Sequence, residues 1–311
     1  MKRKLLTIIS PAFNEKLNLL NFVKKVNEIK TKIVNYELCL VVIDDGSTDG
    51  SINELKKIKQ KFKFLNYISF TKNFGHQAAI FAGLENFCSD YYVIIDSDLQ
   101  QDPYEILKMI KAIDKNKVDI IQMKKINYGY ESAFKTFFSK FFYFLFSKIT
   151  KIKIDSGSSD FYLISKRVRD KIISTTFSNN FLRGFIHWSG YSKIYLEYKP
   201  NRRKLGRSNY NLSKQINFGL TGFFNYQKNF FLSLFFLAIF VMTACFSYVV
   251  YLFLDYYFFA NTAPDGWRTI VVLLLFFSSI NFFINSLMIY LVTILFDKTS
   301  QKPSYIIDEK A

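Results

Sequence analysis

Cysteine and histidine are scarce in this chain, and their scarcity argues against several kinds of site. The three cysteines, Cys39, Cys88 and Cys245, are spaced neither as a zinc motif nor as a paired disulfide framework. The two histidines, His76 and His187, are too far apart in sequence to predict a metal-binding pair, and we expect a structural role for each. Neither a zinc centre nor a disulfide scaffold is therefore predicted.

Acidic residues are also few relative to basic ones. The chain has 42 Lys and Arg against 25 Asp and Glu, which gives a net charge of +17. Nearly all of the Lys and Arg precede Lys228, whereas the last third of the chain is apolar. A basic region followed by apolar segments indicates phosphates and lipid headgroups as partners. Nucleic acid is the competing partner for a basic chain, but no nucleic-acid-binding motif is recognisable, so none is expected.

The first residues lack the long apolar run of a signal peptide. Met1 to Ile9 carries basic residues near its start, but only about five apolar residues precede Ser10 and Pro11. We interpret this stretch as a first β-strand. The region that follows it is therefore expected in the cytosol.

Strand and helix patterns alternate along the first third of the chain. Short β-branched and apolar runs predict strands, and apolar residues spaced three or four apart predict helices. The predicted strands cover 5–9, 38–43, 65–70 and 91–95, and the predicted helices cover 17–29, 48–58 and 77–87. This alternation predicts an α/β fold with a mostly parallel, doubly wound sheet, in which ligands bind beyond the carboxyl ends of the strands.

Polar clusters follow three of the predicted strands, at 11–15, 44–50 and 96–98. Each cluster alone is also explained by an ordinary turn, as for Asp45-Gly46-Ser47 before a helix. Together they predict a pocket for a nucleotide base, a ribose and a metal ion. Asp96 and Asp98 repel each other unless a cation lies between them, and hard oxygen ligands favour Mg²⁺ or Mn²⁺ bound with a diphosphate.

These clusters and several later motifs resemble the nucleotide-sugar-dependent glycosyltransferases of family 2, which have a GT-A fold. The chain is most similar to the branch of polyprenyl-phosphate glycosyltransferases that includes dolichol-phosphate mannose synthase and bactoprenol glucosyltransferases. The matching segments occur in the order of the family, at 11–15, 43–49, 73–79, 96–103, 159–161, 181–184 and 203–210. They lie within a region of about 5–226, and two predicted membrane spans follow it.

The resemblance implies a donor site, position by position. The implied nucleoside contacts are Pro11, Phe13, Glu15, Ile43 and Asp45; the metal and diphosphate contacts are Asp96, Ser97 and Asp98; Gln100 is implied near the sugar, and Lys125 near a phosphate. Phe13 stands where the family often has Tyr, which keeps ring stacking but removes a hydroxyl. The implied metal ligands are Asp96 and Asp98, and the implied cofactor is Mg²⁺ or Mn²⁺.

The segment from Arg203 to Tyr210 resembles the family pattern R-x-x-G-x-S-K-Y. A leaving nucleoside diphosphate and an incoming lipid phosphate bring several negative charges together, and Arg203 would offset them. Asn209 occupies the Lys position of the pattern, so Lys204, Arg207 or Lys214 would have to supply the missing charge. The other interpretation is a solvated basic loop near anionic lipid.

Asp160 corresponds to the family aspartate that lies beside the acceptor and is proposed there as the base. A phosphomonoester has a second pKa of about 6, so a lipid phosphate is largely deprotonated near neutrality. We therefore expect Asp160 to position the acceptor or the metal as much as it removes a proton.

The last third of the chain predicts a membrane domain. The ranges 230–254 and 269–296 contain no charged residue, and each exceeds the roughly 20 residues that a membrane-spanning helix needs. Lys298 and Lys302 follow the second span, so the positive-inside rule predicts both termini in the cytosol. Amphipathic patterns at about 134–149 and, more weakly, 212–226 predict interfacial helices; for the first, a core helix is an equal alternative.

We therefore expect a cytosolic GT-A domain at 1–226 and a membrane domain at 227–311, in the inner (plasma) membrane. The expected activity is that of an inverting hexosyltransferase (EC 2.4) of the cell envelope. It would move a sugar from a UDP- or GDP-sugar to undecaprenyl phosphate at the cytosolic face. The alternatives are transfer to a hydroxyl of a glycolipid or surface-polysaccharide intermediate, and a catalytically silent scaffold that binds nucleotide sugar. The resembled family includes homo-oligomers, and a separate flippase would carry the product across the membrane.

Overall fold

The computed structural model describes residues 3–126, 158–175, 182–201 and 303–311, together with isolated positions between 243 and 295. The chain divides into two compact units, Met1–Asn225 with Pro303–Ala311, and Tyr226–Lys302. The first unit holds all of the strands in the described part of the chain.

Strands and helices alternate through the first unit as the sequence predicts. The strands are β1 (Lys4–Ala12), β2 (Tyr36–Asp44), β3 (Leu65–Phe70), β4 (Tyr91–Ile94), β5 (Ile120–Lys125), β6 (Ser158–Ser165), β7 (Lys193–Tyr198) and β8 (Ile307–Lys310). The helices are α1 (Lys16–Lys32), α2 (Ser51–Lys61), α3 (His76–Asn86), α4 (Glu105–Asn116), α6 (Lys166–Ser174) and α7 (Leu182–Trp188). β1 continues past its predicted end at Ile9 to Ala12, so the first polar cluster begins within the strand itself.

The strands form one sheet in the order β7-β5-β6-β4-β1-β2-β3-β8. The pairs β1–β2, β1–β4, β2–β3 and β5–β7 are parallel. β6 is antiparallel to both of its neighbours, and β8 is antiparallel to β3. The predicted mostly parallel sheet is thus confirmed as a mixed sheet, in which β6 and β8 run against the other strands.

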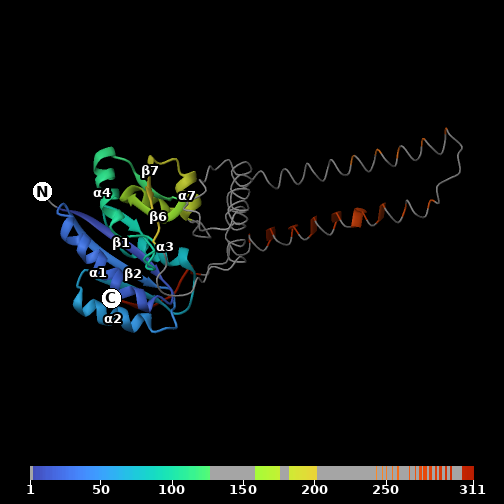
Figure 1. The fold of residues 1–311 in the computed structure, drawn as a ribbon. Coiled ribbons are helices and arrows are strands. Elements are labelled where there is room, and N and C mark those ends of the chain that lie inside the picture. Colours follow the sequence, from blue (N-terminus) through green and yellow to red (C-terminus); the bar gives the residue numbers. More distant parts are fainter. Residues whose placement is uncertain are drawn as a thin grey trace. The chain divides into compact units, whose positions relative to one another are not determined.

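Helices cover both faces of this sheet (Figure 1). On one face, α1, α2 and α4 pack on alternate strand residues, in a cluster that includes Phe22, Leu55 and Met109. On the other face, α3, α6 and α7 pack on the intervening residues, including Ile9 and Ile43. The fold is therefore a three-layer α/β arrangement, because the two-residue period of each strand supplies an apolar side chain to each face.

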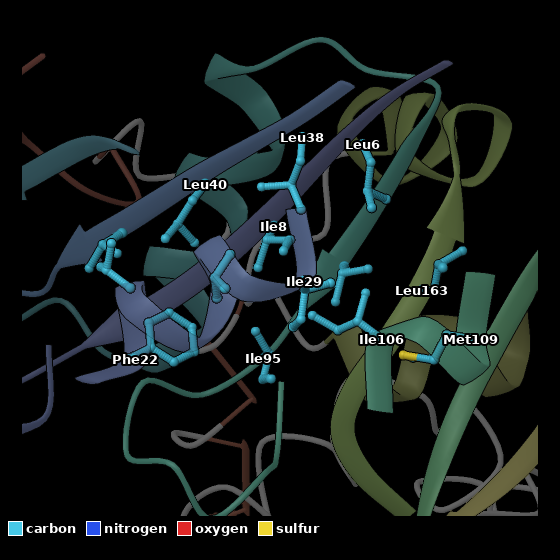
Figure 2. Packing of buried hydrophobic residues seen from close by; sticks show 14 of the residues in the cluster. Leu6, Ile8, Phe22, Ile29, Leu38, Leu40, Ile95, Ile106, Met109 and Leu163 are labelled. Carbon is cyan, nitrogen blue, oxygen red and sulfur yellow. The ribbon is translucent and has the colours of Figure 1, made fainter. Parts of the chain in front are cut away.

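Figure 2 shows the cluster beneath α1 and α4 from close by. The cluster includes Leu6 and Ile8 of β1, Leu40 of β2, and Phe22 and Ile29 of α1, and all five are fully buried. Burying one such side chain contributes about 1.5–3 kcal/mol relative to leaving it exposed. This dense apolar centre anchors the strands whose ends carry the polar clusters.

In the second unit, the described positions from Thr243 to Leu295 are helical. Within this set, Asn285 Nδ2 donates to Asn281 Oδ1 at 3.1 Å, so these two amides bond to each other along one helix. No helix in the described part of the chain is both long and apolar enough to cross a membrane. Most residues of the predicted spans, 230–254 and 269–296, lie outside that part, as do the predicted interfacial helices at 134–149 and 212–226.

Candidate active site

The polar clusters after β1, β2 and β4 meet at one edge of the sheet. β1 and β2 remain paired to their last residues, where Ala12 lies opposite Asp44. The Asp45 amide then donates to Ala12 O at 2.9 Å, and the Ser97 hydroxyl donates to Pro11 O at 3.0 Å. The sequence predicts this meeting, since parallel strands end at the same edge of a sheet.

The loop after β1 is bonded directly to the loop after β2. The Asn14 amide donates to Ser47 Oγ at 2.8 Å, and the Thr48 amide donates to Asn14 Oδ1 at 2.9 Å. Asn14 itself adopts a left-handed backbone with φ of 57°. Such a backbone is unusual outside glycine and tolerated best by Asn and Asp, and here the two reciprocal bonds hold it.

Gly46 allows the loop after β2 to approach the loop after β3. Its φ is +68°, and a Cβ added there would lie 2.3 Å from the carbonyl carbon of Lys72 and 2.7 Å from the amide nitrogen of Asn73. Both neighbours are backbone atoms and cannot rotate away. A side chain at this position would therefore push the two loops apart.

Asp45 joins these same two loops through hydrogen bonds. Its Oδ1 accepts from the Phe74 amide at 2.7 Å, and its Oδ2 accepts from the Gly75 amide at 3.0 Å. Gly75 has φ of +101°, which suits glycine alone and turns its N–H toward the carboxylate. Burial raises the pKa of Asp45 to about 6, although the two amide bonds favour the charged form.

Asp96 is held on both of its carboxylate oxygens. His76 Nε2–H, at the start of α3, donates to Oδ1 at 2.8 Å, and Gln101 Nε2 donates to Oδ2 at 2.9 Å. The Asp96 amide in turn donates to Gln101 Oε1 at 3.1 Å. The structural role expected of His76 thus includes fixing the orientation of a predicted site residue.

Asp98 lies in a tight, strained turn. Its Oδ1 accepts from the Gln100 amide at 3.0 Å across Leu99, whose φ is 61°. Asn201 holds the outer side of this turn: its amide donates to Gln100 O at 2.8 Å, and its Nδ2 donates to Leu99 O at 3.3 Å. A left-handed leucine costs on the order of 1–3 kcal/mol, and such strain is concentrated at functional sites.

Asp160 reaches the same region from the antiparallel strand β6. Tyr162 of β6 pairs with Ile94 of β4, so continuing this register by two residues brings Asp160 opposite Asp96. Tyr198 of β7 lies close to these carboxylates: burial, and then the charges of Asp96, Asp98 and Asp160, raise its pKa to about 12. The register thus brings Asp160 opposite Asp96, and Asp98 lies in the turn that follows.

The other predicted site residues differ in burial and in the element that carries them. Glu15 is buried at the start of α1, where Asn18 Nδ2 donates to its Oε2 at 2.5 Å. The Ile43 side chain is fully buried in the core beneath α3, so only its backbone can face a ligand. Lys125 lies at the end of β5, paired with Tyr198. Pro11 and Ser97 are buried, and Phe13 and Gln100 are half-buried. Arg203 and Asn209 lie outside the described residues.

The donor set around Asp98 fits a hard divalent cation. No group of three or more His, Cys, Asp or Glu side chains in the described ranges is arranged to hold a metal by itself. Mg²⁺ and similar cations nevertheless need only one or two carboxylates when substrate phosphates and water complete the shell. Each oxygen of Asp96 keeps a second lone pair beyond the bond from His76 or Gln101.

Three residues of this site were not predicted from the sequence: Gln101, Tyr198 and Asn201. The contact that His76 makes was not predicted either. Gln101 belongs to the matching segment 96–103, so the motif itself was a signal for it. Tyr198 and Asn201 follow a short alternating stretch with no motif. Their roles depend on β7 lying beside β5, which local sequence does not specify.

The fold and the site define a class of protein, the nucleotide-sugar glycosyltransferases with a GT-A-like fold. Glucosyl-3-phosphoglycerate synthase from Mycobacterium tuberculosis, solved in complex with Mn²⁺, uridine diphosphate and glucosyl-3-phosphoglycerate, has a similar fold, with a TM-score of 0.51. The two chains are 14% identical, and the similarity covers 72% of this chain and 80% of that one. At this identity the likeness concerns the fold alone.

The sequence profile of Glycosyl transferase family 2 matches residues 7–173, which is more than half of the chain. The chain therefore belongs to glycosyl transferase family 2. It is 28% identical to the prophage bactoprenol glucosyl transferase homolog of Escherichia coli, over 97% of this chain and 98% of that protein. It is also 27% identical to the bactoprenol glucosyl transferase of Shigella phage SfX, over 98% and 99% of the two chains.

A third relative is the putative glycosyltransferase CsbB of Bacillus subtilis, which is 26% identical over 99% of this chain and 93% of its own length. These similarities extend well beyond the family 2 region into the apolar last third of the chain. The predicted family resemblance is confirmed.

Proposed function

We propose that this glycosyltransferase moves a hexose, with inversion, from a UDP- or GDP-sugar to a polyprenyl phosphate such as undecaprenyl phosphate. The observation that carries the proposal is the convergence of Asp96, Asp98 and Asp160 at the carboxyl edge of the sheet. The near full-length similarity to proteins named bactoprenol glucosyl transferases supports the choice of a lipid phosphate as acceptor.

The donor half of the site would bind the nucleotide in the loops after β1 and β2. The proposed nucleoside contacts are Pro11, Phe13, Glu15, Asp45 and the backbone of Ile43. Ser97, Gln100 and Lys125 are proposed near the diphosphate and the sugar. The bonds from Asp45 to the Phe74 and Gly75 amides support this assignment, because they hold the loops in place before any ligand arrives.

Asp98, with Asp96 beside it, would hold Mg²⁺ or Mn²⁺ together with the donor diphosphate. When bound, the cation offsets the charge that develops on the leaving nucleoside diphosphate. Asp96 would be kept in register for this task by His76 and Gln101, since hydrogen bonds to a ligating carboxylate set its orientation. The Mn²⁺ in the complex of the Mycobacterium tuberculosis synthase is in keeping with this choice.

In the transfer step, a phosphate oxygen of the acceptor forms a bond to the anomeric carbon, and the bond from that carbon to the donor β-phosphate oxygen breaks. The leaving group is the nucleoside diphosphate. Asp160 would orient the acceptor, which needs little deprotonation because its second pKa is about 6. Arg203, and the segment that includes Asn209, would offset the negative charges on the acceptor side.

The membrane assignment is part of the proposal. β7 and β8 belong to one sheet, so a chain that crosses a bilayer between residues 201 and 303 crosses it an even number of times. Two spans, at about 230–254 and 269–296, agree with that requirement. Large apolar side chains are exposed at helical positions there, including Leu274, Met288 and Val292. The catalytic unit and both termini would then face the cytosol, with the spans in the inner (plasma) membrane.

Two further partners belong to the same proposal. The chain would assemble as a homo-oligomer, as members of the resembled family do. A separate flippase would carry the lipid-linked sugar across, because two helices per chain make a poor channel.

The test is sugar transfer from a panel of UDP- and GDP-sugars to undecaprenyl phosphate in detergent, with Mg²⁺ or Mn²⁺. We expect a metal-dependent product with at least one donor, and an Asp98→Ala variant reduced by about 100-fold or more, as for loss of a main charge-stabilising group. The matched control is Asp102→Ala, which removes a nearby carboxylate that is bonded to the Tyr104 amide instead. Folded protein that transfers no sugar from any donor would reject a lipid phosphate as the acceptor.

A further inference from the structure

Residues 303–311, which we call the docked tail, return to the catalytic sheet from the far end of the chain. Within the tail, β8 pairs antiparallel with β3, with Lys310 opposite Ile68 and Glu309 opposite Ser69. The tail thereby covers an edge strand that would otherwise present unpaired amides and carbonyls. No strand is predicted for this segment from the sequence.

Side chains as well as backbone attach the docked tail. Glu309 accepts from the Tyr67 hydroxyl at 2.9 Å and forms an ion pair with Lys56 of α2 at 2.6 Å. At the other side, Lys310 Nζ donates to Asn86 Oδ1, at the end of α3, at 2.9 Å. Figure 1 accordingly shows the C-terminus beside α2. The tail is thus attached to the elements on both sides of β3.

Tyr305 connects the docked tail to the donor site through aromatic rings. Its ring stacks on Phe70, with centroids 5.1 Å apart and an angle of 17° between the planes. Phe70 meets Phe74 edge to face, with centroids 5.7 Å apart. Phe74 is the residue whose amide donates to Asp45 at 2.7 Å. Two ring contacts and one hydrogen bond therefore connect Tyr305 to Asp45, a proposed nucleoside contact.

A second route runs along α3. The Tyr305 hydroxyl donates to the Glu85 carboxylate and accepts from Asn86 Nδ2, both in the last turn of this helix. The first residue of the same helix is His76, which donates to Asp96. Tyr305 thus contacts both ends of the segment from Phe70 to Asn86. Phe74 and His76, within this segment, bond to Asp45 and Asp96 of the site.

We propose that the docked tail is a positioning element for the donor site, and that Tyr305 is its key positioning residue. Stacking of Tyr305 on Phe70 holds the Phe74 ring in place. The amides of Phe74 and Gly75 then hold the Asp45 carboxylate. The tail thereby favours donor binding without touching the donor. This inference rests on the proposed function for its effect on the nucleotide sugar. The competing explanation is that the tail only protects the sheet edge, which predicts lower thermal stability with unchanged donor binding.

The experiment compares three variants of the full chain in detergent. Tyr305→Ala removes the ring and its hydroxyl bonds, and Tyr305→Phe keeps the ring but removes the hydroxyl. Lys310→Ala is the matched control, because it loses a tail contact to Asn86 but none to Phe70. The readouts are KM and kcat for the nucleotide sugar, the affinity for UDP and GDP, and amide hydrogen exchange of residues 71–76.

We expect Tyr305→Ala to raise the donor KM by about three- to tenfold, as for loss of one aromatic pair, with kcat within about twofold. Exchange at the Phe74 and Gly75 amides should be faster by a similar factor. Tyr305→Phe and Lys310→Ala should stay within about twofold of the native chain in both readouts.

Two results would overturn the inference. One is an unchanged donor KM and unchanged exchange in Tyr305→Ala, even if its melting temperature falls. The other is an equal effect of Lys310→Ala on the donor KM and on amide exchange. That result would show that any loosening of the tail weakens donor binding, without a special role for Tyr305. If the native chain binds neither UDP nor GDP, the proposed function fails, but exchange at Phe74 and Gly75 still decides whether Tyr305 positions that loop.

Discussion

The proposed donor half and the proposed acceptor half of the site are built in different ways. The donor half consists of the loops after β1 to β4, which bond to one another through Asn14 with Ser47, and Asp45 with Phe74 and Gly75. The acceptor half, with Asp160 on β6 and Asn201 after β7, contacts the donor half through the pairing of β6 with β4 and around the Asp98 turn.

This difference indicates a division of labour. A donor pocket held by the protein's own hydrogen bonds loses little conformational entropy when the nucleotide sugar binds. The acceptor half is joined to the donor half by the pairing of β6 with β4 and by the bonds of Asn201 to the Asp98 turn, which are distinct from the loops after β1 and β2 that hold Asp45. Substitutions in the donor half should therefore affect binding and stability, and those in the acceptor half should affect turnover.

The largest effect is expected from Gly46→Ala, in the donor half. The new methyl group would lie 2.3 Å from the Lys72 carbonyl carbon in a left-handed backbone, so the two loops must separate. We expect UDP or GDP affinity to fall by about 100-fold, together with a lower melting temperature. Gly50→Ala is the control: its φ is +85°, but its nearest neighbour is the flexible Lys16 Nζ at 3.5 Å. Equal losses of nucleotide affinity in both variants would contradict the role given to the close approach.

The next effect is a pH dependence of stability that arises at Asp45. Burial raises the folded-state pKa of Asp45 to about 6 from 3.8. Its contribution to the free energy of unfolding is therefore fully present below pH 3.8 and is lost as the pH rises through 6. The free energy of unfolding falls by about 3 kcal/mol over this range, from roughly 1.4 kcal/mol per pKa unit. We expect Asp45→Asn to gain stability relative to the native chain between about pH 4 and pH 7.

Asp49 provides the matched control for that measurement. Burial tends to raise its pKa, but hydrogen bonds from Ser51 and the Lys16 amide outweigh burial and lower it. Its stabilising contribution is present above the unfolded pKa and is lost as the pH falls through the folded one, so Asp49→Asn should show the opposite slope. The measurement is the melting temperature of Asp45→Asn between about pH 4 and pH 7 and of Asp49→Asn below about pH 4, each relative to the native chain, and slopes of the same sign would refute the assignment.

In the acceptor half, Asp160→Asn should reduce turnover with a lipid phosphate by less than about tenfold, because the acceptor is already ionised and the amide can still orient it. Donor affinity should not change. The measurement is a pH profile of kcat with undecaprenyl phosphate. A loss of several orders of magnitude that depends on pH would instead identify Asp160 as a base.

The smallest effect is expected at the junction of the two halves. Asn201→Ala removes the Nδ2 bond to Leu99 O but keeps the amide bond to Gln100 O. We expect kcat/KM for the acceptor to fall by about threefold, as for loss of one neutral hydrogen bond. Asn116→Ala, which loses a similar bond to Ala112 O at the end of α4, is the control and should leave kcat/KM unchanged. Equal kcat/KM values for the two variants would show that the Asn201 bond to Leu99 O does not contribute to acceptor turnover.

Much of the donor half could be predicted before the structure was known. The strands and helices of the first third follow from local periodicity, and their polar ends must meet because parallel strands share one carboxyl edge. The acceptor half was harder to predict. Asp160 was found through a family motif, but its place opposite Asp96 depends on β6 running antiparallel between β4 and β5. Nothing within residues 158–165 specifies that direction.

The α/β alternation, the family and the carboxylates of the site follow from the amino-acid sequence, because apolar periodicity and short motifs are local properties of the chain. The groups that orient those carboxylates are known only from the folded chain. His76 and Gln101 reach Asp96, Asn201 reaches the Asp98 turn, and Tyr305 reaches Phe70. All but the Gln101 bond join elements far apart in the chain, and pairing between distant elements is set by the packing of the whole sheet.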